Sequence, residues 1–279
     1  ARQVVQRAEQ SLAGRTDVLR ELWVQVGVQS YRNDRIATAE LYLSRVWELQ
    51  EEEVPGTVPL YLSELYVRQN RRGEAVDLLE EARSRGLDEQ GDRILLRLAN
   101  LYLEEDDAET AVEVLDAFIE EYPRSDYRSE GEYLRAFALY RLDRDSEALE
   151  QTGETLGSGR AGEYEANLLW LRSLLFRRTG RPEEAIRSLR DYLAVEPDDV
   201  DARLELVKLL FEQGRFEEAI SRSEELLEAQ QDLASQRPAV YYQLRYVEGL
   251  SRVAQKEYGP AIDALSALPQ EASAYRDLP

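Results

Sequence analysis

Apolar side chains recur along this chain at the spacing of one helix face, in pairs of segments separated by a short polar break. In one such segment, Leu95, Leu98, Ala99 and Tyr102 follow one another at intervals of three, one and three residues. These positions share one face at about 3.6 residues per turn, which predicts an amphipathic helix. Two aspartates then interrupt the pattern, and a second helical segment follows until Pro123 ends it.

One alanine near the start of every second helical segment gives the period of this pattern. The separations are 36, 36, 37, 37, 34 and 42 residues, and the alanines are Ala39, Ala75, Ala111, Ala148, Ala185, Ala219 and Ala261. A recurrence of this length is typical of stacked helix pairs. A small residue is needed where the two helices of a pair cross most closely, because a larger side chain would force their axes apart. The pattern therefore predicts an all-α solenoid of helix pairs.

Aligning the alanines divides the chain into repeats. We expect a partial helix of a preceding repeat over residues 1–15, the solenoid over residues 16–275, and a truncated end over residues 276–279. The repeats are expected at about 20–53, 56–89, 92–125, 129–162, 166–199, 200–233 and 242–275. An insertion near 230–238 precedes the last repeat. Because the sequence contains no Met and opens inside a helical pattern, we expect it to be a segment of a longer chain.

The repeated residues resemble the tetratricopeptide repeat (TPR) family, whose pattern is Trp-x2-Leu-Gly-x2-Tyr followed by Ala, an aromatic residue, Ala and Pro. The first repeat has Trp23 and Gly27, and the third has Tyr102, Ala111 and Pro123. The resemblance extends over roughly residues 16 to 275. It implies about seven helix-turn-helix repeats in a right-handed superhelix, and a protein-binding role. Two positions where the family prefers Leu carry charged residues, Arg135 and Glu248.

A narrower resemblance concerns location. The segment from Tyr122 to Tyr127 is similar to the Tyr-Pro-x-Ser-x-Tyr linkers between repeats of bacterial envelope proteins, such as outer-membrane assembly lipoproteins and periplasmic division-coordinating proteins. This resemblance favours a periplasmic over a cytoplasmic location. The motif also has a structural role, because it ends one helix and starts the next.

The charge balance changes which partners are expected. The formal net charge is −21, with 56 acidic and 35 basic residues. Nucleic-acid-binding proteins usually carry a basic footprint, so this balance argues against nucleic acid as a partner, and it disfavours anionic membrane surfaces. No stretch approaches about 18 uncharged apolar residues, so we expect no direct membrane insertion by this segment.

The sequence offers little for catalysis. It has no Cys and no His, which removes thiolate chemistry and the commonest general base and metal ligand. The stretch from Gly157 to Gly162 matches the dinucleotide fingerprint G-x-G-x-x-G, but it follows a helical pattern rather than a strand, which indicates a loop. Asp143, Asp145 and Glu147 lack the Gly and the later Glu of a calcium loop. We therefore expect no catalytic residues, no cofactor and no metal site.

In a solenoid of helix pairs, the first helix of each pair lines the concave surface, and helical phase assigns that lining. The residues expected to bind a partner there are mostly apolar and aromatic. They are Tyr31, Leu60, Tyr61, Leu96, Asn100, Tyr133, Phe137, Tyr140, Trp170, Leu174, Arg177 and Phe211. The densest patch is expected at Tyr133, Phe137, Tyr140, Trp170 and Leu174. Such a lining suits an extended or helical peptide that buries its own apolar side chains.

These observations predict a non-catalytic scaffold that binds a protein or peptide in the concave groove. Two alternatives stay open, and catalysis is the least favoured. A partner could bind the convex or edge surface, or the chain could be a self-assembling structural or spacing component of a bacterial envelope or motility-related complex. Two arginine groups either dock an acidic segment or pair with neighbouring glutamates. They are Arg68, Arg71 and Arg72, and Arg177, Arg178 and Arg181.

Overall fold

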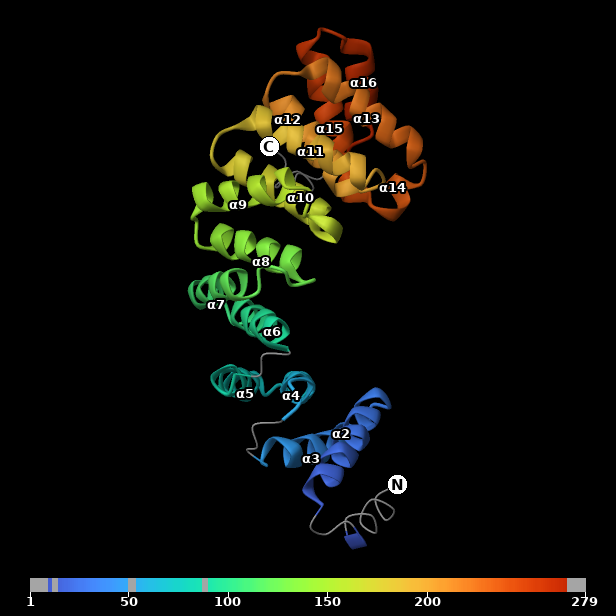
Figure 1. Ribbon diagram of the computed structural model, residues 1–279. Helices are drawn as coiled ribbons and strands as arrows, with labels where there is room; N and C mark the ends of the chain where they lie inside the picture. The colour runs from blue at the N-terminus through green and yellow to red at the C-terminus, as the bar shows by residue number, and fades with distance from the viewer. Residues whose placement is uncertain (1–9, 12–14, 50–53, 87–89, 270–279) are drawn as a thin grey trace. The chain divides into compact units, whose positions relative to one another are not determined.

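The computed structural model describes residues 10–11, 15–49, 54–86 and 90–269 (Figure 1). Every regular element within these ranges is a helix, and none is a strand. None of the described helices combines the length and the apolar composition that a membrane crossing requires. The expected partial helix over 1–15 lies largely outside the described residues, and the expected end at 276–279 lies wholly outside them.

The chain divides into two compact units, an N-terminal unit of residues 1–143 and a C-terminal unit of residues 144–279. The N-terminal unit contains α2 (Thr16–Arg32), α3 (Ile36–Trp47), α4 (Thr57–Arg68), α5 (Arg72–Ser84), α6 (Gly91–Glu104), α7 (Ala108–Glu121) and α8 (Arg128–Arg141). The C-terminal unit contains α9 (Asp145–Gly157), the 3-10 turn η2 (Gly162–Tyr164), α10 (Glu165–Arg178), α11 (Pro182–Val195), α12 (Val200–Glu212), α13 (Phe216–Ala229), α14 (Leu233–Gln236), α15 (Pro238–Ala254) and α16 (Tyr258–Ser266). The all-α fold class is thereby confirmed, while the number of repeats and their boundaries stay predictions.

The alanines that gave the period occupy one structural place. Each is the fourth residue of its helix, in α3, α5, α7, α9, α11, α13 and α16. Each exposes at most 2% of its surface. Within the two units, α2 packs on α3, α6 on α7, and α10 on α11. The prediction that these alanines face the packed interior is confirmed.

The turn in front of each alanine has one geometry. Five residues before every alanine lies a residue with φ between 57° and 69°, and these residues are Asp34, Asn70, Asp106, Asp143, Gly180, Gly214 and Lys256. In six of the seven turns the next N–H donates to a carbonyl five positions back, as Arg71 does to Tyr66 at 2.8 Å and Arg215 to Leu210 at 2.9 Å. A left-handed residue followed by this bond ends a helix and satisfies its last carbonyls. Gly, Asn and Asp adopt the left-handed conformation most easily, which accounts for six of these seven residues.

Two glycines let the helices of a pair approach closely. A Cβ atom on Gly27 of α2 would lie 2.6 Å from Leu43 Cγ of α3, and one on Gly249 of α15 would lie 2.6 Å from Leu265 Cγ of α16. Other pairs carry small buried residues at the same distance before the repeat alanine, Ser63, Ala99, Ala136 and Ser173. The expectation of a small residue on both helices is met in six of the seven pairs, and the exception is Val207 in the pair of α12 and α13.

The two irregular places in the sequence pattern have simple structural accounts. The insertion near 230–238 forms the short helix α14, whose buried Leu233 joins a core cluster with Leu226 and Leu244. Glu248, at a position where Leu was expected, is buried but paired with Arg245 at 3.0 Å and Arg252 at 2.9 Å. A buried carboxylate is tolerated when cations and hydrogen bonds compensate for its lost hydration.

Candidate peptide-binding surface

The first helices of the N-terminal unit are neighbours. α2 contacts α4, α4 contacts α6, and α6 contacts α8, while α3, α5 and α7 pack against the helices that follow them. Partly exposed side chains of α2, α4, α6 and α8 therefore contribute to one surface, which we call the first-helix surface. The predicted partner-binding residues on it are Tyr31, Leu60, Tyr61, Leu96, Asn100, Tyr133, Phe137 and Tyr140.

An aromatic cluster joins α2 to α4 on this surface. The ring centroids of Tyr31 and Tyr61 lie 5.0 Å apart, with the ring planes tilted by 58°. Arg68 Cζ lies 4.9 Å from the centroid of Tyr31, and Arg68 Nη2 donates to the Tyr31 hydroxyl at 3.2 Å and to Glu64 Oε1 at 3.1 Å. Burial raises the pKa of Tyr31 to about 12, and the Glu64 carboxylate adds to this effect. The Tyr31 hydroxyl is therefore protonated at neutral pH.

A hollow of about 260 Å³ lies between α4, α6 and the start of α8. It is lined by Leu60, Glu64, Arg93, Leu96, Arg97, Asn100, Tyr127 and Glu130. Leu96 is 4% exposed, so it forms the base of the hollow rather than its rim. Asn100 Nδ2 donates to the Leu96 carbonyl at 3.0 Å, which fixes the amide beside it. The structure thus brings together three predicted residues from two helices and adds charged side chains of both signs.

Three aromatic residues continue the first-helix surface along α8. Tyr133, Phe137 and Tyr140 recur at spacings of four and three residues, so they lie on one helix face, and all three are half-buried. The rings of Tyr133 and Phe137 are stacked, with centroids 6.3 Å apart and planes 26° apart. Trp170 and Leu174, which were expected to complete this patch, belong to the C-terminal unit. The patch as a whole therefore stays a prediction.

In the C-terminal unit, two predicted partner-binding aromatics contribute to the core. Trp170 of α10 packs against Tyr192 of α11, with ring centroids 5.4 Å apart, and against a cluster of buried residues. Phe211 of α12 contacts Phe216 at 5.8 Å and two such clusters. Both stay partly exposed, as does Leu174. Helical phase placed these residues on a face but could not show that their large rings turn toward the second helices.

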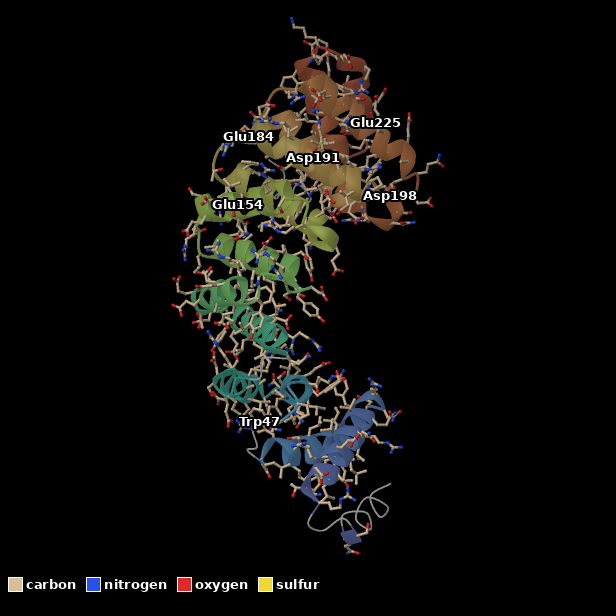
Figure 2. The ribbon with its side chains drawn as sticks, in the orientation of Figure 1. Trp47, Glu154, Glu184, Asp191, Asp198 and Glu225 are labelled. Carbon is tan, nitrogen blue, oxygen red and sulfur yellow. The ribbon has the colours of Figure 1, made fainter. Side chains whose placement is uncertain are left out.

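The two arginine groups are engaged in ion pairs. Each of the six arginines forms an ion pair with at least one carboxylate. The pairs are Arg68–Glu64, Arg71–Glu74, Arg72–Glu104, Arg177–Glu212, Arg178–Asp145 and Arg181–Glu184. Figure 2 shows the nitrogen and oxygen atoms of charged side chains along the outside of both units, with Glu184 labelled. The structure favours the pairing interpretation over docking of an acidic segment. Arg177, which was predicted to bind a partner, already forms ion pairs with Glu205 and Glu212 of α12.

Two family models of the tetratricopeptide repeat match this chain, over residues 93–125 and 177–244. Three solved structures are similar to it. The C-terminal part of a TPR repeat-containing protein from Cytophaga hutchinsonii has a TM-score of 0.72 at 11% sequence identity, covering 90% of this chain and 97% of that chain. A tetratricopeptide repeat protein from Parabacteroides merdae has a TM-score of 0.61 at 18% identity, covering 91% and 95%. YrrB, described as a TPR protein with an unusual peptide-binding site, has a TM-score of 0.55 at 18% identity, covering 72% and 97%.

The chain contains tetratricopeptide repeats over residues 93–125 and 177–244, and it has the fold of TPR proteins. A comparison with curated proteins finds no match. Tetratricopeptide repeats are typically non-catalytic interaction modules that present an extended surface to protein partners. In the ranges that the structure describes, no group of three or more acidic side chains is arranged to hold a metal ion.

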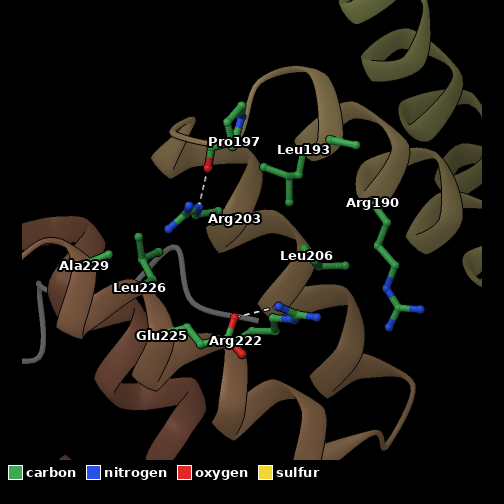
Figure 3. Close-up of a pocket in the computed structure, with 10 residues that line it drawn as sticks. Arg190, Leu193, Pro197, Arg203, Leu206, Arg222, Glu225, Leu226 and Ala229 are labelled. Carbon is green, nitrogen blue, oxygen red and sulfur yellow. Dashed lines mark hydrogen bonds and ion pairs between the residues drawn. The ribbon is translucent and has the colours of Figure 1, made fainter.

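This TPR protein also has a larger hollow that sequence analysis missed. It measures about 570 Å³ and lies in the C-terminal unit between α11, α12 and α13 (Figure 3). Its lining consists of Arg190, Leu193, Ala194, Pro197, Arg203, Leu206, Arg222, Glu225, Leu226 and Ala229. None of these residues was predicted to bind a partner. They come from three helices and a loop. On the second helices α11 and α13 they recur at helical spacing, but sequence analysis assigned only the lining formed by first helices and therefore did not select them.

Proposed function

We propose that this TPR protein is a non-catalytic scaffold that binds a protein segment on the first-helix surface of its N-terminal unit. The observation that carries the proposal is the hollow between α4, α6 and α8. Along the row of first helices, the Tyr31–Tyr61 cluster lies on one side of it and the Tyr133–Phe137 stack on the other. Aromatic side chains are the usual anchors of protein interfaces, because they bury much area at low entropic cost.

The occupant is a peptide that places one or two apolar side chains in the hollow. A volume of about 260 Å³ lies near the lower end of the range for ligand sites, so it suits side chains rather than a whole cofactor. Arg93, Arg97, Glu64 and Glu130 at its edge supply donors and acceptors for the polar groups of a peptide. YrrB, which shares the fold, is described as having a peptide-binding site, and this supports a peptide partner.

The test uses a displayed library of random 12-residue peptides selected against the full chain. The double variant Leu60→Ala with Phe137→Ala removes one wall of the hollow and one ring of the aromatic stack. We expect it to weaken the selected peptide at least about tenfold, the factor that corresponds to 1.4 kcal/mol, as measured by isothermal titration calorimetry. The control is Val76→Ala, a half-buried apolar residue on the second helix α5.

The two results separate clearly. Loss of affinity in the double variant, with unchanged binding by Val76→Ala and unchanged helicity in all proteins, supports the first-helix surface. Equal affinity for the wild type and the double variant contradicts it. A selection that yields no binding peptide from repeated rounds also counts against a peptide-binding function for this surface.

Self-association and location stay predictions. The residues that a self-assembling form would bury best are Tyr258 and Ile262 of α16, which are 60% and 63% exposed. A molar mass from sedimentation equilibrium that stays at the monomer value of 32.1 kDa at every concentration would exclude self-assembly. For the envelope motif, the structure shows a local role. Ser125 Oγ donates to Asp92 Oδ2 at 2.6 Å, and the Tyr127 N–H donates to Ser125 Oγ at 3.1 Å. This role supports the structural interpretation of the motif and leaves a periplasmic location as a proposal.

A further inference from the structure

Three arginines from three helices line the 570 Å³ hollow of the C-terminal unit. Arg190 comes from α11, Arg203 from α12 and Arg222 from α13, and Glu225 is the one acidic residue among the ten that line it (Figure 3). The lining therefore carries a formal charge of +2, from three arginines and one glutamate. The whole chain carries −21, so the ten lining residues are more positive than the chain as a whole. Each arginine also has a carboxylate beside it, in the pairs Arg190–Glu218, Arg203–Asp198 and Arg222–Glu225.

The arginines are held in place without using all of their hydrogen-bond donors. Arg203 Nε donates to the Pro197 carbonyl at 2.7 Å, and Arg222 Nη1 donates to Glu225 at 2.6 Å. Arg190 Nη2 pairs with Glu218, while its Nε is buried and has no hydrogen-bond partner. A guanidinium carries five N–H donors, and a buried donor without a partner is costly. An acceptor that enters the hollow can instead reach the exposed part of the Arg190 side chain, which is 39% exposed.

The rest of the lining is apolar. Leu206 and Leu226 are 3% and 1% exposed, so they form the floor. Leu193 is half-buried, and the exposed Ala194 and Ala229 complete the walls. A carboxylate alone would fill only a small part of about 570 Å³, whereas an apolar side chain next to it would cover this floor. The hollow therefore combines the two recognition elements of an acidic, apolar segment.

We propose that this hollow, which we call the arginine pocket, binds a peptide segment in which an Asp or Glu side chain stands next to a side chain the size of Leu or Phe. Arginine is suited to this role because its planar fork forms two parallel hydrogen bonds with a carboxylate. A nucleic acid is disfavoured, because a polyanion would meet the surrounding negative charge beyond the pocket. A single carboxylate in a short segment meets three arginines and one lining carboxylate, Glu225.

The arginine pocket is separate from the first-helix surface. Seven of its ten lining residues belong to the second helices α11 and α13, and none is among the residues predicted for the concave face. Its specificity also differs, since the hollow on the first-helix surface has charged residues of both signs in equal number. The proposal thus adds a second binding site, on the side formed by second helices, with a preference for acidic segments.

The test measures binding of synthetic 12-residue peptides to the full chain. Each peptide contains one Asp or Glu among Leu and Phe residues. Its N-terminus is acetylated and its C-terminus is amidated, so that only the acidic side chain is ionised. For each acidic peptide there is a matched amide peptide, in which Asn replaces the Asp or Gln replaces the Glu. We expect the best acidic peptide to bind at least about tenfold more tightly than its amide partner. Arg190→Gln and Arg222→Gln should each lower the affinity by about the same factor.

The matched control is Arg187→Gln, which removes the same charge from an exposed position on α11 outside the pocket. It should change the affinity by less than about twofold, because exposed charges act weakly through solvent. Melting curves establish that all three variants are folded. Arg190 and Arg222 lie on different helices, so if one substitution unfolds the protein the other still tests the pocket.

Three results would overturn the arginine pocket. In the first, the acidic peptide and its amide partner bind the protein with equal affinity. In the second, Arg187→Gln weakens binding of the acidic peptide as much as Arg190→Gln and Arg222→Gln do. In the third, neither Arg190→Gln nor Arg222→Gln weakens it. The variant Leu60→Ala with Phe137→Ala should bind the acidic peptide normally. The arginine pocket and the first-helix surface can therefore fail independently of each other.

Discussion

At the residue scale, the crossing of two helices is set by a pair of small residues rather than by the repeat alanine alone. Gly27 and Ala39 both lie where α2 meets α3, and Leu43 fills the space beside Gly27. The sequence made this crossing predictable, because small residues recur on both helices at fixed spacing. It could not show which large side chain would occupy the remaining space, since that depends on rotamers and not on period.

The first prediction concerns this contact. Gly27→Ala should lower the free energy of unfolding by about 1–3 kcal/mol, because the new Cβ would lie 2.6 Å from Leu43 Cγ in a packed interior. The effect should be much smaller in a Leu43→Ala background, where the space is open. Gly153→Ala in α9 is the control, since no neighbouring atom lies within 4 Å of its new Cβ. It should stabilise the protein by up to about 1 kcal/mol through helix propensity.

Urea unfolding followed by circular dichroism measures both changes. A Gly27→Ala protein as stable as the wild type would contradict the close approach of α2 and α3. Equal effects of Gly27→Ala in the wild-type and the Leu43→Ala backgrounds would show that the cost comes from another contact.

At the element scale, four second helices begin with the same ion pair. The residue before the helix is an arginine, and it binds the glutamate three positions later in the pairs Arg71–Glu74, Arg144–Glu147, Arg181–Glu184 and Arg215–Glu218. None of these four starts has a side-chain cap hydrogen bond. The pair instead fixes a carboxylate in the first turn, where the helix dipole favours negative charge. Sequence analysis named Arg71 and Arg181 and left pairing with neighbouring glutamates open, and the structure shows that pairing.

The second prediction is a pH effect of these pairs. Hydrogen bonds from Arg71, Arg181 and Arg215 lower the pKa of Glu74, Glu184 and Glu218. Because the pKa of each is lower in the folded than in the unfolded state, the stabilisation is present above the unfolded value of about 4.3 and is lost as pH falls through the folded value. The triple variant to Gln should therefore show a shallower fall of melting temperature below about pH 5 than the wild type.

The control for this effect is a triple variant to Gln at Glu113, Glu154 and Glu217. These are exposed glutamates without an ion-pair partner among the described residues. Melting temperatures between about pH 3 and pH 7 should fall in parallel for this control and the wild type. The same shallow curve in both triple variants would mean that loss of net negative charge, rather than the Arg–Glu pair, is responsible.

At the scale of the whole molecule, each helix packs mainly against helices that are close to it in the chain. This is why the fold could be predicted from a period: the contacts that define it repeat with the residues that make them. The boundary between the two units after Asp143 has no counterpart in the repeat pattern. The arginine pocket was missed because helical phase was used only to assign the lining formed by first helices, whereas most of this pocket is formed by second helices. On the first-helix surface, helical phase placed Leu60, Leu96 and Asn100 in the lining, but it did not place Arg93, Arg97 or Glu130 there.

Packing between near neighbours leads to the third prediction, on how damage spreads. Ala219 is fully buried among residues of α11, α12 and α13, so Ala219→Arg places a charge in that cluster and should open it. In a repeat protein, stability is approximately a sum of local terms, so the opening should stay near its origin. Hydrogen exchange measured by mass spectrometry should become faster in peptides from α11, α12, α13 and α15, and should be unchanged in peptides from α2 to α7. Glu217→Arg, an exposed substitution on the same helix, should leave exchange unchanged throughout. Faster exchange over the whole chain in the Ala219→Arg protein would instead show one cooperative unit, because only then does a defect in α13 reach α2.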